Sequence, residues 1–360
     1  MDVRAARHNE RDEVLDLLAL WYNDREFFAR YNQLDPTFRD ELCLVARDGG
    51  RLVSTVQIFD RAINLDGHSV PMGGIGSVFT LEEYRHKGVA SALMRLAVDT
   101  MVREGFEVSL LFAERLTFYN QFGWREVDRK FSILAGGGGL KPANSDGWDR
   151  FEIDVFDETR DLPEVAEIHR AYSGRFNVAA VRDRPAWRAN LRFAGNQPMR
   201  PGEGSEEYFT ICRERGGRIV AYARVTRFHG VSMVMEFGYR PGDDDAMLAT
   251  FKYLAEEASG AAISLRRVGD HRRSALLRGT PDSSSASMLV THTAHDLDLE
   301  KKIANAGCPI AHHVDNNYMW RILAPEKLAR RFAMAPEAAS THAFDLFSDS
   351  NSLFWTSDRF

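Results

Sequence analysis

The chain has 360 residues, of which 44% are apolar, and a formal net charge of −6. This length exceeds that of an ordinary single domain and predicts two hydrophobic cores. Lysine and arginine are scattered along the chain, so the sequence lacks the basic footprint of a nucleic-acid-binding protein. No apolar run is long enough to cross a membrane, and no signal-peptide pattern opens the chain. We therefore expect a cytoplasmic protein without a membrane or nucleic-acid partner.

The amino-terminal third alternates between helical and extended patterns. In chain order we expect a short strand at 3–5, a helix ending near Trp21, a second helix over 26–31, strands over 42–47 and 52–59 around the turn Asp48-Gly49-Gly50, and a turn at Asp66-Gly67 that leads into a strand ending near Thr80. This last strand carries several glycines, which favour a bulge or a close approach of another backbone. An antiparallel meander is therefore expected to feed one glycine-rich central strand.

That strand is followed by the most informative stretch of the chain, Arg85-His86-Lys87-Gly88-Val89-Ala90. Apolar residues then recur with helical spacing up to about Glu104, which predicts an amphipathic helix. A helix amino terminus presents unpaired backbone N–H groups and a partial positive charge. With a glycine and two basic residues at this point, the segment is predicted to bind the diphosphate of a phosphorylated cofactor.

The pattern Arg85-x-x-Gly88-x-Ala90 after a strand, with Tyr119 ahead of Phe122-Gly123-Trp124, resembles the GNAT N-acetyltransferase family. The resemblance implies an acetyl-CoA-dependent acyltransferase in which residues Arg85, His86, Lys87, Gly88, Val89 and Ala90 hold the diphosphate. It also implies that the backbone of Val78, Phe79 and Thr80 binds the pantetheine arm and the thioester carbonyl. Tyr119 corresponds to the family's general acid; a core tyrosine with no catalytic role is the alternative.

The second half contains an echo of the first. Gly49-Gly50-Arg51-Leu52-Val53 recurs as Gly216-Gly217-Arg218-Ile219-Val220 and is followed by a strand pattern over 231–237 and a helix pattern over 246–258. Four glycines at 136–139 predict a linker between the two copies. Where the first copy has basic residues, the second has Gly242-Asp243-Asp244-Asp245, whose carboxylates repel a diphosphate. The second copy is therefore predicted to be a structural domain.

A tandem arrangement with only the first copy active resembles the Eis (enhanced intracellular survival) acetyltransferases. We therefore expect an α/β (α+β, mixed-sheet) fold with four parts: a catalytic GNAT domain at 1–135, a linker at 136–149, a degenerate GNAT-like domain at 150–323 and a carboxy-terminal helix and tail at 324–360. The last part is too short for the sterol-carrier-like domain of that group and resembles a truncated form of it. The resemblance implies that the α-carboxylate of Phe360 reaches the active site as a base or water anchor, and it is compatible with a homo-oligomer. Phe354 and Trp355 indicate that the tail is docked.

The acceptor is predicted less sharply. In the GNAT family the first two helices border the acceptor site, which implicates Trp21, Asp24 and Glu26; a solvated turn is the alternative. The acidic balance of the chain favours a cationic amine, either a small molecule or a lysine side chain. A mycothiol-synthase-like enzyme for one dedicated metabolite and a non-catalytic acyl-CoA-binding module are the rival functions. No metal cofactor is expected, because the His292–His295–Asp296 and His312–His313 groups lack a third ligand at diagnostic spacing.

Overall fold

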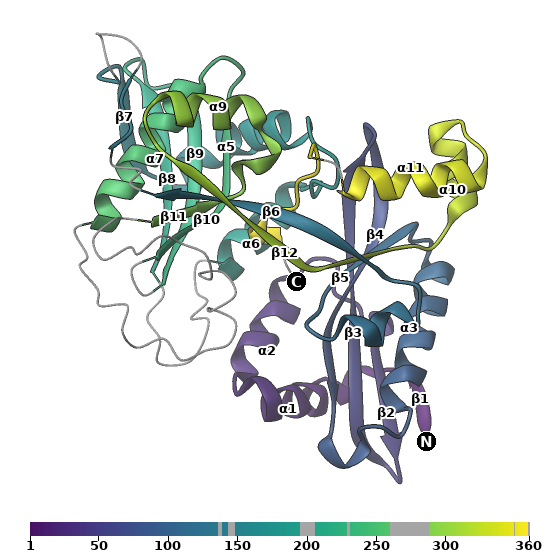
Figure 1. The fold of residues 1–360 in the computed structure, drawn as a ribbon. Helices are drawn as coiled ribbons and strands as arrows, with labels where there is room; N and C mark the ends of the chain where they lie inside the picture. Colours follow the sequence, from purple (N-terminus) through teal and green to yellow (C-terminus); the bar gives the residue numbers. More distant parts are fainter. Residues whose placement is uncertain are drawn as a thin grey trace.

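The computed structural model describes residues 1–135, 139–142, 148–194, 206–228, 231–259, 288–348 and 350–358. Over these residues the chain forms one mixed sheet of 12 strands in the order β1-β2-β3-β4-β5-β12-β6-β11-β10-β9-β8-β7, with helices on both sides (Figure 1). The α/β class expected from the sequence is confirmed. No helix within these ranges is long and apolar enough to cross a membrane.

The amino-terminal half follows the order expected from its patterns. Its elements are β1 (Asp2–Ala5), α1 (Arg11–Tyr22), α2 (Arg25–Leu34), β2 (Cys43–Asp48), β3 (Arg51–Leu65), β4 (His68–Thr80), α3 (Val89–Glu104), β5 (Val108–Phe112), α4 (Leu116–Asn120) and β6 (Arg125–Ala135), with short 3-10 turns η1 (His8–Glu10), η2 (Asp40–Leu42) and η3 (Glu82–Tyr84). Helices α1 and α2 lie on one side of the strands and α3 on the other (Figure 1). Helix α3 packs closely: a Cβ built on Gly73 of β4 would lie 2.5 Å from the Met101 sulfur, so this glycine permits the contact.

The carboxy-terminal half repeats this order. Its elements are β7 (Phe151–Val155), α5 (Glu158–Ser173), α6 (Arg184–Ala194), β8 (Glu206–Glu214), β9 (Ile219–Phe228), β10 (Val231–Tyr239), α7 (Asp244–Ser259), β11 (Met288–Thr291), η6 (Thr293–His295), α9 (Leu297–Asn305) and β12 (Ile310–Ile322). The repeated glycine motif lies in equivalent places, because Gly50 ends the β2–β3 turn with φ +88° and Gly217 the β8–β9 turn with φ +85°. The internal repeat seen in the sequence is therefore a repeat of structure.

The two copies exchange their last strands. Strand β12 of the second copy pairs antiparallel with β5 and with β6 of the first, and β6 in turn pairs with β11 of the second. Both partners of β6 therefore come from the distant half and not from the segment next to it in the sequence. Tyr318, Met319 and Trp320 of β12 are fully buried by this exchange. The glycine-rich segment thus divides the sequence but not the sheet, and the four domain limits remain a prediction.

The end of the chain covers the centre of the sheet. Helix α10 (Pro325–Phe332) leads to α11 (Pro336–Ser348), whose Phe347 stacks on Trp320 with ring centroids 4.4 Å apart. In the tail Phe354 and Trp355 are buried, as their aromatic character predicted. A final 3-10 turn, η7 (Thr356–Asp358), ends the described part near α2 and α6 (Figure 1). Phe360 lies outside the described residues, so its predicted place in the site stays a prediction.

Candidate active site

Strand β4 carries a bulge beside its carboxyl end. The register between β3 and β4 shifts between Gly76 and Phe79, so that Ser77 and Val78 together face Val56. Ser77 adopts a positive φ of +49°, which is unusual for a residue with a side chain. A bulge leaves its extra residue outside the ladder and redirects the backbone. The glycines of β4 thus flank the bulge and permit helix packing, while the bulge itself falls on Ser77 and Val78.

The same part of β4 separates from its other neighbour. The parallel pairing of β4 with β5 ends at Ile75 and Leu111, and residues 76–80 have no partner on β5. Unpaired backbone N–H and C=O groups need a partner, because leaving them buried and unsatisfied is costly. The edge of β4 that faces away from β3 is therefore without a strand partner at 76–80, although the Phe79 carbonyl accepts from Ser54 Oγ and the Thr80 carbonyl from Arg85 Nε. This arrangement fits the predicted role of Val78, Phe79 and Thr80.

The predicted cofactor loop connects this open strand to α3. Gly88 has φ +80°, and α3 begins at the next residue. The first hydrogen bond of the helix runs from the Ala92 N–H to the Gly88 carbonyl at 2.9 Å. The N–H groups before Ala92 therefore have no acceptor within the helix, and together with the helix dipole they form an anion site. His86 also adopts a positive φ, +61°, so the loop turns sharply just before the helix.

Two basic side chains of this loop rest on aromatic rings. The Arg85 guanidinium carbon lies 5.6 Å from the Trp21 ring centre, and the Lys87 Nζ lies 5.2 Å from the Tyr84 ring centre. Arg85 Nε also donates to the Thr80 carbonyl at 3.3 Å. Within the described parts of the chain, neither Arg85 nor Lys87 has a carboxylate at ion-pair distance. Both charges are thus available to a diphosphate.

The equivalent point of the second copy has the opposite charge. Helix α7 begins at Asp244, and Asp243, Asp244 and Asp245 are paired with cations of their own: Arg218 lies 3.4 Å from Asp243, Arg150 lies 3.7 Å from Asp245, and Lys302 binds Asp244. Carboxylates stabilise a helix amino terminus and exclude a phosphate from it. These contacts agree with the prediction that the second copy does not bind a coenzyme here.

Strand β10 of the second copy corresponds to β4 of the first and also separates from its parallel neighbour, β11. Strand β10 leaves β11 after Met233 and bulges next to Glu236, but here the space is occupied by side chains and by the tail. Glu236 is fully buried and binds Arg182 at 2.8 Å, and Arg182 binds Asp358 of the tail at 2.7 Å. Burial alone would raise the pKa of Glu236, but Arg182 holds it well below its ordinary value.

Trp355 completes this closure. Its ring centroid lies 5.0 Å from that of Phe237 on β10, and its Nε1 donates to Ser173 Oγ at 3.0 Å. The buried charge network and Trp355 could not be assigned to a place from the sequence, because burial of single acidic and basic residues leaves no periodic signal.

Tyr119 lies on α4, the helix that follows β5. Strand β5 is the neighbour from which β4 separates after Ile75. Its side chain is half-buried and meets Phe118 edge to face at 5.0 Å. Tyr119 and Val78 both pack against the core beneath α3. The structure thus places the predicted acid on the helix that follows β5, the strand from which β4 separates; its catalytic role stays a prediction.

The three predicted acceptor residues have different surroundings. Trp21 is 62% exposed, and its ring centroid lies 6.3 Å from that of Phe79 beside the bulge. Asp24 accepts a hydrogen bond from the Phe27 N–H at 2.9 Å and caps α2, which is a structural role that its position before the helix could have indicated. Glu26 is exposed on the first turn of α2.

A second polar group on the α2 side was missed from the sequence. Arg61 of β3 donates to the Tyr31 hydroxyl at 2.6 Å and to Asp35 at 2.8 Å. Burial raises the pKa of Tyr31 to about 12, and the nearby Asp358 carboxylate adds to this shift. The Asp358 carboxylate of the tail therefore lies close enough to α2 to act on the Tyr31 hydroxyl.

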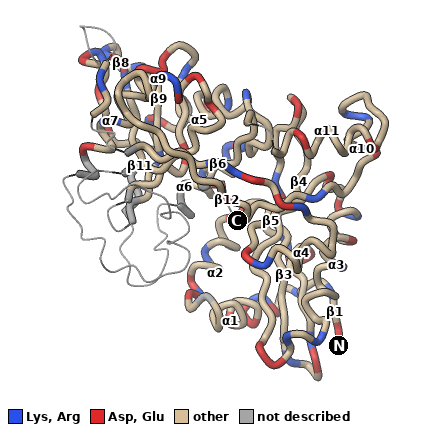
Figure 2. Tube along the Cα trace, in the orientation of Figure 1, with Lys and Arg blue, Asp and Glu red and all other residues tan. Residues whose placement is uncertain are grey.

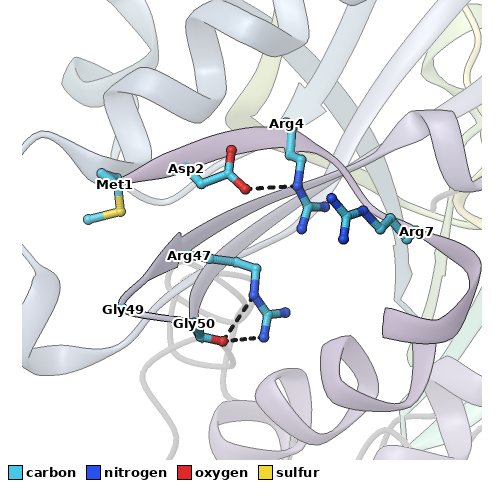
Figure 3. Close-up of a pocket in the computed structure, with 7 residues that line it drawn as sticks. All are labelled: Met1, Asp2, Arg4, Arg7, Arg47, Gly49 and Gly50. Carbon is cyan, nitrogen blue, oxygen red and sulfur yellow. Dashed lines mark hydrogen bonds and ion pairs between the residues drawn. The ribbon is translucent and has the colours of Figure 1, made fainter.

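Other features of the surface lie away from this opening. Figure 3 shows a pocket of about 470 Å³ at the β1–β2 edge, lined by Met1, Asp2, Arg4, Arg7, Arg47, Gly49 and Gly50. Its arginines are largely balanced, since Glu10 bonds to both Arg4 and Arg47. Basic and acidic residues are interspersed over the described parts of both halves (Figure 2).

Metal and thiol chemistry find no support in the described residues. No group of three or more His, Cys, Asp or Glu side chains in the described ranges could hold a metal ion. Cys43 lies on β2 and is buried, and burial raises the pKa of its thiol to about 12, so it is a poor nucleophile.

Comparison with known proteins shows which proteins the chain is similar to in sequence. A family model for the GNAT acetyltransferase domain matches residues 2–127. An uncharacterized N-acetyltransferase from Streptomyces avermitilis is 27% identical over 188 residues, which are 49% of this chain and 42% of that protein. The aligned part thus spans less than half the length of this relative.

Solved structures share the fold at low identity. Eis1 from Mycobacterium abscessus is 14% identical with a TM-score of 0.59, covering 93% of this chain and 76% of that one. A GCN5-related N-acetyltransferase from Kribbella flavida is 19% identical with a TM-score of 0.58, covering 91% and 72%. N-myristoyltransferase from Saccharomyces cerevisiae, solved with myristoyl-CoA, is 11% identical with a TM-score of 0.50, covering 88% and 82%. The part of the chain that matches the GNAT acetyltransferase domain model, residues 2–127, contains both the bulged strand and the loop at Gly88.

Proposed function

We propose that this protein is an N-acetyltransferase that transfers the acetyl group of acetyl-CoA to a primary amine. The observation that carries the proposal is the continuous path from the bulge of β4 to the start of α3. The segment 76–80, which has no partner on β5, suits the pantetheine arm, and the helix terminus at Gly88 with Arg85 and Lys87 suits the diphosphate. The second copy closes both features with its own residues, so one coenzyme per chain is proposed.

The reaction proceeds by direct attack. The neutral amine attacks the thioester carbonyl carbon, the C–N bond forms, and the C–S bond then breaks as the tetrahedral intermediate collapses. The Val78 N–H holds the oxyanion, a contribution of about 3 kcal/mol if the donor is preorganised. Tyr119 gives its phenolic proton to the departing thiolate and recovers one from solvent. The attacking nitrogen loses its proton to water, assisted by the α-carboxylate of Phe360.

The carboxy-terminal half serves as a scaffold in this proposal. It supplies β12, which pairs with β5, and it anchors the tail through Arg182 and Asp358. The tail would carry Phe360 toward the acceptor side of α2. The acceptor is proposed to be a cationic amine, because acidic residues gather around the α1–α2 connection.

Tyr119→Phe tests the enzymatic function. The variant keeps the ring and removes only the acid, so acetyl-CoA affinity is expected to stay the same while kcat falls by about 10²-fold or more. Dissociation constants come from calorimetry, and kcat comes from thiol release on a panel of amines. Equal kcat in variant and parent would remove Tyr119 from the mechanism. Coenzyme binding without acetylation of any amine would favour the non-catalytic module.

A further inference from the structure

The cations of the cofactor loop lie over aromatic rings. Arg85 lies over Trp21 at 5.6 Å, while its Nε contacts the Thr80 carbonyl at 3.3 Å. Trp21 stands at the end of α1 and is 62% exposed, in contrast to the fully buried Trp124, Trp320 and Trp355. Trp21 thus contacts a residue predicted to bind the cofactor while most of its ring stays accessible to a second ligand.

Coenzyme binding must change this contact. A diphosphate binds a guanidinium by charge-assisted, often bidentate hydrogen bonds, which are stronger than an exposed cation–π contact of about 0.5–1 kcal/mol. Arg85 is therefore drawn toward the helix terminus at Gly88, where the unpaired N–H groups also lie. Lys87 has a similar contact with Tyr84, but the Tyr84 hydroxyl bonds to Asp48 at 3.1 Å, which fixes that ring to the β2–β3 turn.

The ring that Arg85 leaves lies at the reacting end of the site. The centroids of Trp21 and Phe79 are 6.3 Å apart, and Phe79 directly follows the bulge residues Ser77 and Val78. We propose that Trp21 is a cation-binding residue for the acceptor, which contacts Arg85 until the coenzyme binds and contacts a charged group of the acceptor afterwards. This inference rests on the proposed function and specifies its substrate class.

The chemistry of the reaction defines that class further. The attacking nitrogen must be neutral, whereas cation–π binding requires a charge. The group on Trp21 is therefore a second ammonium of the same molecule, and the acceptor is a diamine or polyamine. The exposed Glu26 and the Asp24 carboxylate, both at the α1–α2 connection, add a negative field that favours such a ligand.

The arrangement makes the two ligands cooperative. An acceptor cation and Arg85 compete for one ring, and the coenzyme removes Arg85 from the competition. Coenzyme A must then raise the affinity for the acceptor, and by linkage the acceptor must raise the affinity for coenzyme A by the same factor. Acetyl-CoA is expected to bind first.

The first test concerns the contact between Arg85 and Trp21. Trp21→Leu removes the ring that competes for Arg85, and Trp21→Phe keeps a ring at the same place. Calorimetry with coenzyme A should show a dissociation constant about 2–5-fold lower in Trp21→Leu than in the parent, the factor that corresponds to about 0.5–1 kcal/mol, with Trp21→Phe between the two. Unchanged or weaker coenzyme binding in Trp21→Leu would refute the claim that the Trp21 ring competes with the coenzyme for Arg85. This result does not depend on catalysis.

The second test concerns the acceptor. Putrescine and butylamine share a carbon chain but differ by one ammonium. In the parent, saturation with coenzyme A should tighten putrescine binding by about 2–5-fold, the factor that corresponds to releasing the ring from its contact with Arg85, and leave butylamine binding unchanged. The gain should vanish in Trp21→Leu and return in part in Trp21→Phe. Equal putrescine affinity with and without coenzyme A, or an equal gain in Trp21→Leu, would refute the proposal. If coenzyme A increases putrescine affinity but the protein acetylates no amine, the result would count against the proposed function and not against the role of Trp21.

Discussion

Replacing Trp355 by alanine should destabilise the whole protein, although the residue lies five positions from the end of the chain. Its side chain is fully buried, packs on Phe237 at 5.0 Å and donates a hydrogen bond to Ser173. Removing a buried tryptophan leaves a cavity and costs about 3–5 kcal/mol. Because the described part of the segment after α11 contains only one short 3-10 turn, a loss of this size would be diagnostic of a docked tail.

The measurement is urea unfolding of the full chain, with the free energy of unfolding extrapolated to water. Trp355→Phe keeps an aromatic ring and loses the bond to Ser173, so a smaller loss of about 1–2 kcal/mol is expected. Trp21→Ala is the matched surface control, since Trp21 is 62% exposed, and it should change stability by less than about 0.5 kcal/mol. If Trp355→Ala and Trp21→Ala lose the same small amount, the tail does not pack in the second copy as described.

Two further predictions concern the first copy. In Gly88→Ala the added Cβ meets no other atom, but the alanine would have to adopt φ +80°, which should strain the loop by about 1 kcal/mol. The acetyl-CoA dissociation constant measured by calorimetry should therefore rise about fivefold. An affinity equal to the parent's would argue against this loop as the binding site. Glu10→Gln should lower the free energy of unfolding by about 1–3 kcal/mol at neutral pH, because its hydrogen bonds to Arg4 lower the pKa of Glu10 to about 2. A carboxyl group whose pKa is lowered by folding stabilises the fold at pH values above its pKa in the unfolded state. In urea titrations the difference in free energy of unfolding between variant and parent should therefore shrink as the pH falls from about 4.5 toward 2. A difference independent of pH would contradict the assignment.

The parts of the fold that are encoded locally could be predicted from the sequence. The loop Arg85–Ala90 and the helix after it depend on neighbouring residues, so spacing and residue type were sufficient. The acidic start of α7 was readable for the same reason. Trp355 was expected to be docked because aromatic residues are costly to leave in water, although its partners could not be named.

The exchange of β6 and β12 could not be predicted, because an alternating pattern indicates a strand but not its partner. Strand pairing between segments separated by about half the length of the chain depends on tertiary packing. The same limit applies to Glu236, Arg182 and Asp358, which look like solvated charges in the sequence and form a buried network in the structure. Asp24, which was predicted to contact the acceptor, also caps α2, and that structural role could have been expected from its position before the helix.

The central claim is that the first copy alone binds the coenzyme, at the start of α3. Calorimetric titration of the full chain with acetyl-CoA tests it most directly, using Arg85→Gln and, as the matched variant before α7, Arg240→Gln. The account predicts one acetyl-CoA per chain, an affinity at least about tenfold weaker in Arg85→Gln, which corresponds to the loss of a charged hydrogen bond, and an unchanged affinity in Arg240→Gln. Two sites per chain, or a loss of binding in Arg240→Gln but not in Arg85→Gln, would contradict it.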